Sequence, residues 1–416
     1  MYDRWIAGGL RERLIRPYVH LLFGARQTGK STLLGDLVPA DALRFNLADP
    51  QERSRHLAHP GEFAQACRSL PSKRKGQFVF VDDTQSVPSI FDAVQALYDA
   101  DKTRWRFVLC GSSARKLRVT GANLLPGRCL VHHLHPLTLA EHPAGAHGIP
   151  HAHPPSPLSF PWAGRAPAGE RFPEWDLTTR LAYGGLPGIV TADPQDRPGL
   201  LKAYAFVHLE EEIRREALVR DWGAFVRFLQ LAASESGGIT NYARISQQSG
   251  VSQPAVKNHY QLLEDMFVGI RVPAYAKSPR KNLLSTPKFL FFDLGVRHAA
   301  AGLNPSPDLV RANPGPVFEQ WVGIELWQRL QYLGEGRLYH QRSRDGAEVD
   351  FIIERAGALT PVEVKWTENP TLGDARHLLT FLREKKQEAK HGYVICRCPR
   401  PLQLHDHITA LPWFLL

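Results

Sequence analysis

The chain has 416 residues, of which 43% are hydrophobic and 22% are charged. This is close to ordinary globular usage, which excludes a chain too polar to bury a sizeable core, and the length predicts two to three domains. The net charge of +10 favours a polyanionic partner, nucleic acid ahead of an anionic membrane surface. No run reaches the roughly 18 apolar residues of a spanning helix, and five scattered cysteines fit a reducing compartment. We therefore expect a cytoplasmic protein with no membrane partner.

Short apolar segments, each followed by a polar loop, alternate with helical patterns through about residue 140. These segments are LIRPYVHLLFG, ALRFNL, GQFVFVDD and RWRFVLCGSS. Continuous apolar runs of this kind fit strands buried on both faces of a parallel sheet, and SIFDAVQALYDA between two of them has helical spacing. We therefore predict an α/β domain over residues 1–175. Within it, residues 142–173 are rich in Pro, Gly, Ala and His and are expected to form a long exposed loop.

Helical patterns dominate the second predicted domain, residues 176–304, and a last α/β domain is expected over residues 305–416. The final domain has four predicted strands, RLYHQRS, AEVDFIIER, LTPVEVKW and GYVICRC, and before them VFEQWVGIELWQRL, predicted to be an amphipathic helix. The chain is thus α/β at both ends and helical in the middle.

A phosphate-binding motif follows the apolar run VHLLF and precedes the helical pattern STLLGDLV. It matches G-x-x-x-x-G-K-[ST] in full, over Gly24, Ala25, Arg26, Gln27, Thr28, Gly29, Lys30 and Ser31, with Thr32 next in the chain. In such a loop the backbone N–H groups surround the phosphates. Lys30 would then reach the β and γ oxygens, and the Ser31 hydroxyl would bind Mg²⁺. The motif predicts ATP and Mg²⁺ as ligands.

Two further apolar runs end in polar residues that suit the same site. The run FVFV ends in Asp82 and Asp83. Asp82 is placed to hold Mg²⁺ through water, and Asp83 to polarise the attacking water. Two acids can also simply open a loop. The run FVLC ends in Gly111-Ser112, where Ser112 could sense the γ-phosphate or serve only as a turn residue.

The middle of the chain contains a helix-turn-helix pattern, with Gly250 at the turn. In the second helix Gln253, Lys257 and Asn258 face away from the core, where base edges or phosphates could be met. A basic stretch follows and suits a wing that grips a phosphate backbone. Its cations are Arg271, Lys277, Arg280, Lys281 and Lys288. Because winged helices also serve as protein-docking or lid modules, a DNA contact is one of two interpretations.

Carboxylates near the C-terminus have a spacing that suits metal-dependent phosphodiester cleavage. Asp350 lies in one predicted strand, and Glu363 and Lys365 point to one face of the next. If the strands form a hairpin, Asp350 lies beside Glu363, and the two can hold Mg²⁺ while Lys365 orients a water. Glu319 on the preceding helix is the third candidate ligand. The alternative is a fold that keeps these acids for structure or partner binding.

In all these segments the chain resembles AAA-type ATPases, and more narrowly a bacterial and archaeal family with an AAA-type N-terminal domain and a restriction-endonuclease-like C-terminal domain. The resemblance is carried by GARQTGKSTLL, FVFVDDTQSVP, VLCGSSARKL, LLPGRCLVHHLHPLTLAE, LAYGGLPGIV, FFDLGVRHAA, VFEQWVGIEL, GAEVDFII and PVEVKW. It implies a PD-(D/E)xK nuclease site at Asp350, Glu363 and Lys365. The family usually has Asp-Glu at Asp82-Asp83, which implies slower hydrolysis here.

The resemblance also suggests that Arg128 reaches a γ-phosphate in a neighbouring subunit as an arginine finger, with a structural salt bridge as the alternative. A finger acting between subunits implies a homo-oligomer, with a hexamer as the candidate assembly. The leading hypothesis is an ATP-dependent DNA-processing protein with a nuclease-like domain. The alternatives are a nucleotide-gated DNA- or protein-binding switch that does not cut, and, by analogy only, a toxin or antiviral-defence protein.

Overall fold

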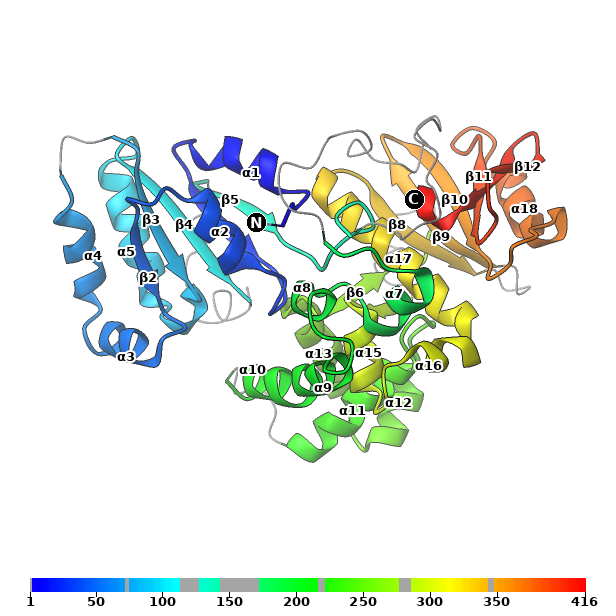
Figure 1. Ribbon diagram of the computed structural model, residues 1–416, viewed down its shortest axis with the longest axis horizontal. Helices are drawn as coiled ribbons and strands as arrows, with labels where there is room; N and C mark the ends of the chain where they lie inside the picture. The colour runs from blue at the N-terminus through cyan, green and yellow to red at the C-terminus, as the bar shows by residue number, and fades with distance from the viewer. Residues whose placement is uncertain are drawn as a thin grey trace. The chain divides into compact units, whose positions relative to one another are not determined.

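The computed structural model describes residues 2–71, 75–112, 127–142, 172–215, 221–276, 286–342 and 348–416. Its backbone contacts divide the chain into two compact units. Of the described residues, the first unit comprises those up to residue 135 together with residues 265–267, and the second comprises the others. Each unit is considered by itself below (Figure 1).

The first unit is built on a five-stranded parallel sheet of order β2-β3-β4-β1-β5. The strands are β1 (Val19–Phe23), β2 (Leu43–Asn46), β3 (Gln77–Asp82), β4 (Trp105–Gly111) and β5 (Cys129–His133). The helices are α1 (Ala7–Leu14), α2 (Lys30–Leu37), α3 (Pro50–Ala58), α4 (Gly61–Arg68) and α5 (Ser89–Ala100), with a 3₁₀ turn η1 (Thr84–Ser86). The predicted parallel sheet is confirmed, and the four predicted runs are its first four strands.

Both faces of this sheet are covered, as the continuous apolar runs require. On β1, Leu21 belongs to a buried cluster with residues of α4 and α5, whereas Leu22 belongs to a second cluster with residues of α1 and α2. Successive side chains of a strand point to opposite faces. Parallel strands placed this way bring their carboxyl ends to one edge, where ligands of open α/β sheets bind.

The second unit contains a helical part and a six-stranded mixed sheet. Its helices are α7 (Leu177–Tyr183), α8 (Pro187–Val190), α9 (Arg197–Ala203), α10 (Leu209–Arg215), α11 (Trp222–Ser234), α12 (Tyr242–Ser249), α13 (Gln253–Asp265), α15 (Leu294–Ala300), α16 (Pro307–Ala312), α17 (Pro314–Leu333) and α18 (Arg376–Glu384). A π-helical turn η2 (Tyr204–His208) joins α9 to α10, and 3₁₀ turns form at η3 (Leu372–Ala375) and η4 (Trp413–Leu415).

The six-stranded sheet has the order β12-β13-β11-β10-β9-β8. Its strands are β8 (Arg337–Arg342), β9 (Glu348–Arg355), β10 (Ala358–Val364), β11 (Gly392–Cys396), β12 (Leu402–His405) and β13 (Ile408–Pro412). The sequence predicted β8 to β11 and missed the last two strands, which are short. A separate antiparallel pair is formed by β6 (Gly269–Val272) and β7 (Lys288–Phe291).

Helix α17 differs from the amphipathic helix expected from VFEQWVGIELWQRL. Between Val317 and Leu330 nearly every side chain is buried, including the polar Gln320, Glu325 and Arg329. A helix that is covered all round lies in the core of its unit rather than on its surface. The expectation was wrong because the polar residues, which suggested a solvated face, are instead bonded inside the protein, as Glu325 is to Arg329.

A two-glycine turn before α8 is held by one buried carboxylate. Asp293, at the start of α15, accepts hydrogen bonds from the backbone N–H groups of Gly185, at 2.7 Å, and Val296, at 3.0 Å. A Cβ atom at Gly184 would lie 2.2 Å from the Asp293 oxygens, so only glycine fits. Burial nevertheless raises the pKa of Asp293 to about 6. A buried hydrogen bond therefore joins the sequence segments LAYGGLP and FFDLGVR.

Candidate functional sites

The phosphate-binding loop joins β1, an interior strand of the sheet between β4 and β5, to α2, as the sequence predicted. Lys30 is buried, and its ammonium donates to the carbonyl oxygens of Gly24 and Ala25, both at 2.8 Å. A Cβ atom at Gly24 would lie 2.1 Å from the carbonyl oxygen of Leu134, the residue after β5, so only glycine fits at this close approach. Gly29 begins α2 with a φ of 91°, in the left-handed region that favours glycine. The loop thus has the backbone and the lysine of a phosphate cradle.

The remaining residues of the motif surround this cradle. Ser31 and Thr32 are exposed in the first turn of α2, and Gln27 is exposed with a φ of 59°. Thr28 is buried, with its hydroxyl donating to the Ala25 carbonyl at 2.9 Å, and Arg26 is half-buried. Hydroxyl and carboxylate oxygens are the donors Mg²⁺ prefers, so Ser31 and Asp82 fit the ion that accompanies a nucleotide.

A residue outside the motif fastens this loop. The buried guanidinium of Arg4 donates to the Thr28 carbonyl and to the His135 carbonyl, each at 2.7 Å. Arg4 therefore ties the middle of the loop to the segment that follows β5. Sequence reasoning missed this residue because it lies 24 positions before its partner in the loop and belongs to no motif.

The acidic end of β3 lies at the same sheet edge as the loop. Asp82 is half-buried and accepts hydrogen bonds from the Cys110 thiol and the Asp83 N–H. Burial, followed by the Asp82 charge, raises the pKa of the Cys110 thiol, while the charge of Lys30 lowers it. Because Lys30 acts on the same thiol, Asp82 and the loop lysine belong to one electrostatic site.

Asp83 is held by its own neighbours. It adopts a left-handed backbone conformation with a φ of 58°, and its carboxylate accepts from the Gln85 amide and from the Ser86 hydroxyl. The same Gln85 amide nitrogen lies 3.0 Å from the Ser112 hydroxyl oxygen, where it donates a hydrogen bond. Gln85 therefore links the second acid to the polar residue after β4, a connection that the sequence analysis did not anticipate.

Arg128 lies beside the amino ends of the strands, whereas the phosphate-binding loop lies at their carboxyl ends. It immediately precedes β5, and its carbonyl accepts from the N–H of Val19 at the start of β1, whereas the phosphate-binding loop follows the end of β1. The strand between them is five residues long, so its first and last Cα atoms are about 13 Å apart at a rise of roughly 3.3 Å per step. Arg128 Nε donates to Asp99 at 2.6 Å, and both side chains are partly exposed. Within one chain Arg128 therefore belongs to a salt bridge, and a finger role would have to be played in another subunit.

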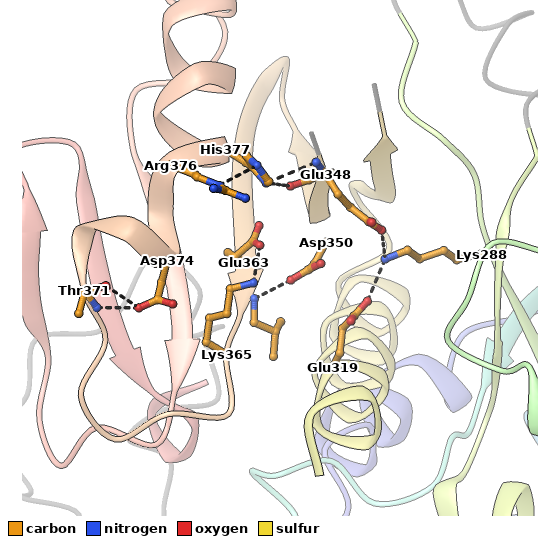
Figure 2. A network of polar contacts seen from close by, with 11 residues as sticks. Lys288, Glu319, Glu348, Asp350, Glu363, Lys365, Thr371, Asp374, Arg376 and His377 are labelled. Carbon is orange, nitrogen blue, oxygen red and sulfur yellow. Dashed lines mark hydrogen bonds and ion pairs between the residues drawn. The ribbon is translucent and has the colours of Figure 1, made fainter. Parts of the chain in front are cut away.

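The C-terminal acids meet on paired strands of the mixed sheet (Figure 2). Strands β9 and β10 are antiparallel, with Phe351 opposite Val362, so Asp350 and Glu363 occupy the next position. Lys365 donates to Glu363 at 2.7 Å, and the backbone N–H of Val364 donates to Asp350 at 2.8 Å. The hairpin that the sequence suggested thus brings these three side chains together.

A second lysine lies among the same carboxylates. The Lys288 ammonium lies 2.8 Å from a Glu319 oxygen and 3.0 Å from a Glu348 oxygen, and its side chain is only 3% exposed (Figure 2). The sequence had placed Lys288 in an exposed basic wing, and this is corrected: the position begins β7, pairs with Ile239 and faces acids. Its fellow wing residue Arg271 is likewise paired with Glu264.

Burial and mutual repulsion shape the titration of these acids. Burial, then the charges of Glu319 and Glu363, raises the pKa of Asp350 well above its usual range. The pKa of Glu363 is also raised by burial, against the lowering effect of Lys365. Conversely, the carboxylates raise the pKa of Lys288 although its burial opposes this. Ionisation of these carboxylates therefore costs free energy, and a further cation beside them would reduce that cost.

The oxygen atoms present fit a hard divalent cation only in part. Glu363 Oε2 is buried and makes no hydrogen bond, and Asp350 is crowded by other acids. These two side chains would hold the ion. However, among the residues that the structure describes, no group of three or more His, Cys, Asp or Glu side chains is placed to hold a metal. Glu319, the third candidate ligand, is instead engaged by Lys288.

The helix-turn-helix pattern is present as α12 and α13, with Gly250 ending α12 at a φ of 73°. Gln253, Lys257 and Asn258 are exposed on α13, whereas Val256 and Tyr260 are buried. A groove of about 560 Å³ opens beside them. We call it the α12–α13 groove; it is lined by Ile239, Thr240, Asn241, Tyr242, Ala243, Arg244, Gln253, Lys257, Thr286 and Arg342. Lys277, Arg280 and Lys281 lie outside the described residues.

Three family models match successive parts of the chain. Residues 16–142 match an AAA domain, residues 174–307 a domain of unknown function (DUF8612) and residues 314–416 another domain of unknown function (DUF4143). Uncharacterized proteins of Mycobacterium bovis and Mycobacterium tuberculosis are each 25% identical over 370 residues, which cover 88% of this chain and 74% of each relative.

One solved protein from Vibrio cholerae aligns over 95% of this chain and 94% of its own, at 12% identity and a TM-score of 0.18, a score that carries no argument. None of the described helices is both long and apolar enough to cross a membrane. An AAA domain suggests nucleotide-dependent ATPase activity, typically with Mg²⁺. The chain carries such an AAA domain, followed by two domains whose function is unknown.

Proposed function

We propose that this protein is an ATP-dependent DNA-processing protein, in which the AAA domain binds and hydrolyses ATP with Mg²⁺ and the second unit binds DNA at a nuclease-like site. The observation that carries the DNA-processing part is the Asp350–Glu363–Lys365 group on paired strands. The proposal also includes the folds: α11 to α13 with β6 and β7 form a winged helix, and the C-terminal sheet with α17 and α18 is restriction-endonuclease-like.

The ATPase part is supported by the residues at the loop edge of the parallel sheet. Lys30 would exchange two carbonyl partners for phosphate oxygens, which are charged and bind an ammonium more strongly. Asp82 and Ser31 would hold the magnesium ion. Asp83, held by Gln85 and Ser86, is the remaining acid near the position of the attacking water. Its reach is one methylene shorter than that of a glutamate, so slow turnover is expected.

The cleavage part follows from the chemistry of the second site. Asp350 and Glu363 would hold a divalent cation, which when bound neutralises phosphate charge and lowers the pKa of a water. Lys365 lies beside Glu363, where its ammonium can orient that water or stabilise charge on the phosphate. The bond broken would be a phosphodiester P–O bond, with the water oxygen forming the new P–O bond.

A second candidate function is a nucleotide-gated binding switch that does not cut. It is favoured by one observation: Lys288 and Lys365 already form ion pairs with three of the carboxylates, and the described residues contain no ready group of three metal ligands. In this alternative the acids and lysines are a structural network. DNA or protein docking would then be the output of the ATPase cycle.

The position of Arg128 is the basis for a proposed assembly of several copies of the chain. Because it lies at the sheet edge opposite its own phosphate-binding loop, it can contact a nucleotide only in another copy of the chain. We therefore propose a homo-oligomer, with a hexamer as the candidate, in the cytoplasm and without a membrane partner.

The proposal is tested by measuring ATP hydrolysis and strand cleavage on single-stranded, duplex, forked and four-way DNA with Mg²⁺ or Mn²⁺. Lys30→Ala should abolish hydrolysis, and Asp350→Asn should abolish cleavage while leaving hydrolysis intact. DNA binding without cleavage under either metal would favour the switch. No salt-dependent DNA affinity on any substrate would eliminate both DNA functions.

A further inference from the structure

Two hollows in the second unit have lining residues in common, one lying beside the predicted DNA-contacting helix and the other beside carboxylates. The first is the α12–α13 groove. The second, of about 280 Å³, is lined by Ser236, Gly237, Gly238, Ile239, Lys288, Pro316, Glu319, Arg342 and Glu348. Ile239 and Arg342 border both. Neither the sequence motifs nor the family resemblance indicates this connection.

We propose that the joined hollows form the path of a single polynucleotide strand, which runs from α13 past Arg342 to the carboxylates. This rests on the proposed DNA-binding function and deepens it, because it names the substrate form and the residue at the junction. Arg342 thereby becomes a binding residue for the strand's phosphate, at the point where the strand turns from the helices toward β9.

Charge along the path supports a phosphate backbone as its occupant. Lys257 borders the first hollow and Arg342 borders both, while Arg244, also at the first hollow, is paired with Glu235 at 2.8 Å. Arg342 is exposed and lies opposite Glu348 across the β8–β9 pairing, so it marks the boundary between the basic and acidic stretches. Lysine and arginine side chains along a groove are the usual electrostatic track for a nucleic-acid backbone.

The acidic end of the path limits how a phosphate can arrive there. Glu319 and Glu348 line the second hollow, and Asp350 follows Glu348 by two residues on the same face of β9. A phosphate would be repelled by these acids unless cations are present. Lys288 already supplies one between Glu319 and Glu348. Arg342 therefore guides the strand to the edge of the acidic stretch, where Lys288 offsets one of the two negative charges of Glu319 and Glu348.

Size and an aromatic side chain favour one strand over a duplex. The second hollow has about half the volume of the first and is slightly smaller than the roughly 300 Å³ at which small-molecule sites begin, which leaves room for no more than about one nucleotide. Tyr242 borders the first hollow, half-buried, with the Lys257 ammonium 5.5 Å from its ring centre. Bases of single strands stack on such rings without sequence preference.

The test uses the full-length protein, a fluorescent oligothymidine and a duplex of equal length, with binding followed by anisotropy over a range of salt. Arg342→Glu should weaken single-strand binding about tenfold and reduce the salt slope by about one or two phosphate contacts. Arg383→Glu is the matched control, because Arg383 is exposed on α18, away from both hollows, and should bind as the wild type does. Thermal melting of both variants checks that they fold.

A second measurement locates the strand directly. A photo-cross-linking amino acid at position 239 should label the oligothymidine, whereas one at the exposed Leu303 should not. If the wild type binds DNA while Arg342→Glu matches Arg383→Glu and position 239 gives no cross-link, the path is wrong and the proposed DNA-binding function stands. A loss confined to the duplex overturns the single-strand assignment. If the wild type binds neither DNA, the proposed function fails together with the path.

Discussion

The Lys288 ammonium lies 2.8 Å from Glu319, and the two residues come from different elements, the start of β7 and the first turns of α17. The lysine also contacts Glu348 at 3.0 Å on β9. A buried cation that joins three elements holds the helical part of the second unit against its sheet. The acids near it depend on this cation for their charge balance.

Replacing Lys288 by methionine should destabilise the second unit by about 3 kcal/mol, the lower end for a broken buried pair because both glutamates keep some exposure. Urea unfolding would measure this change, and Lys288→Met with Glu319→Gln should recover part of it. The raised pKa of Lys288 means that its contribution is complete at neutral pH and is lost only as pH rises beyond the ordinary lysine range. Equal stability of wild type and Lys288→Met would contradict the counter-ion role.

When no divalent metal ion is present, Asp350→Asn should stabilise the folded protein against thermal unfolding. Because the pKa of Asp350 is raised in the fold, keeping this carboxylate ionised costs free energy at neutral pH. We expect the melting temperature to rise by roughly 2–4 °C for each kcal/mol relieved. Millimolar Mg²⁺ should raise the melting temperature of the wild type but not of the variant. A metal-independent melting temperature in the wild type would favour the non-cutting switch.

Lys30→Ala should weaken binding of a fluorescent ATP analogue by at least about tenfold, because a charge-assisted bond to phosphate is lost. Lys102→Ala removes an exposed lysine of the same unit and serves as the matched control. Titration calorimetry of both variants would measure the difference. Equal affinity in the two variants would remove Lys30 from the nucleotide site.

Arg128→Ala and Asp99→Ala separate the two roles open to Arg128. Both break the 2.6 Å salt bridge, which is exposed and adds little stability. If Arg128 is an arginine finger, only Arg128→Ala should lower the turnover number, by up to about a thousandfold, while ATP binding is spared. Steady-state ATPase assays at saturating nucleotide decide between them. Full turnover of Arg128→Ala would rule out the arginine-finger role.

Acid should destabilise the first unit through paired histidines. His20 and His132 stack with ring centroids 5.6 Å apart, and burial lowers their pKa to about 4 and about 3. In the unfolded chain these histidines bind protons near pH 6.5, so between that pH and about 4 the unfolded chain binds more protons than the folded protein does. Stability should therefore fall on acidification, by about 1 kcal/mol per histidine per pH unit. Urea midpoints at pH 7 and 5 should differ less for His132→Asn, and an unchanged difference would be contrary to this account.

Features encoded by neighbouring residues could be predicted from the sequence. The phosphate-binding loop is a contiguous motif, its strand and helix follow from apolar periodicity, and the hairpin from Asp350 to Lys365 needs only a short turn. Period-two alternation also placed Glu363 and Lys365 on one face, where they are 2.7 Å apart. In such cases the chain's local geometry leaves few alternatives.

Tertiary structure alone decided the partners of residues far apart in the chain. Arg4 reaches Thr28, Asp293 reaches Gly185 over 108 positions, and Lys288 turns from an apparent wing cation into a buried counter-ion. No periodicity encodes these pairs, because they depend on how separate elements pack and on which charges lose their water. The two hollows that Ile239 and Arg342 both border arise in the same way, from surfaces that only the folded chain brings together.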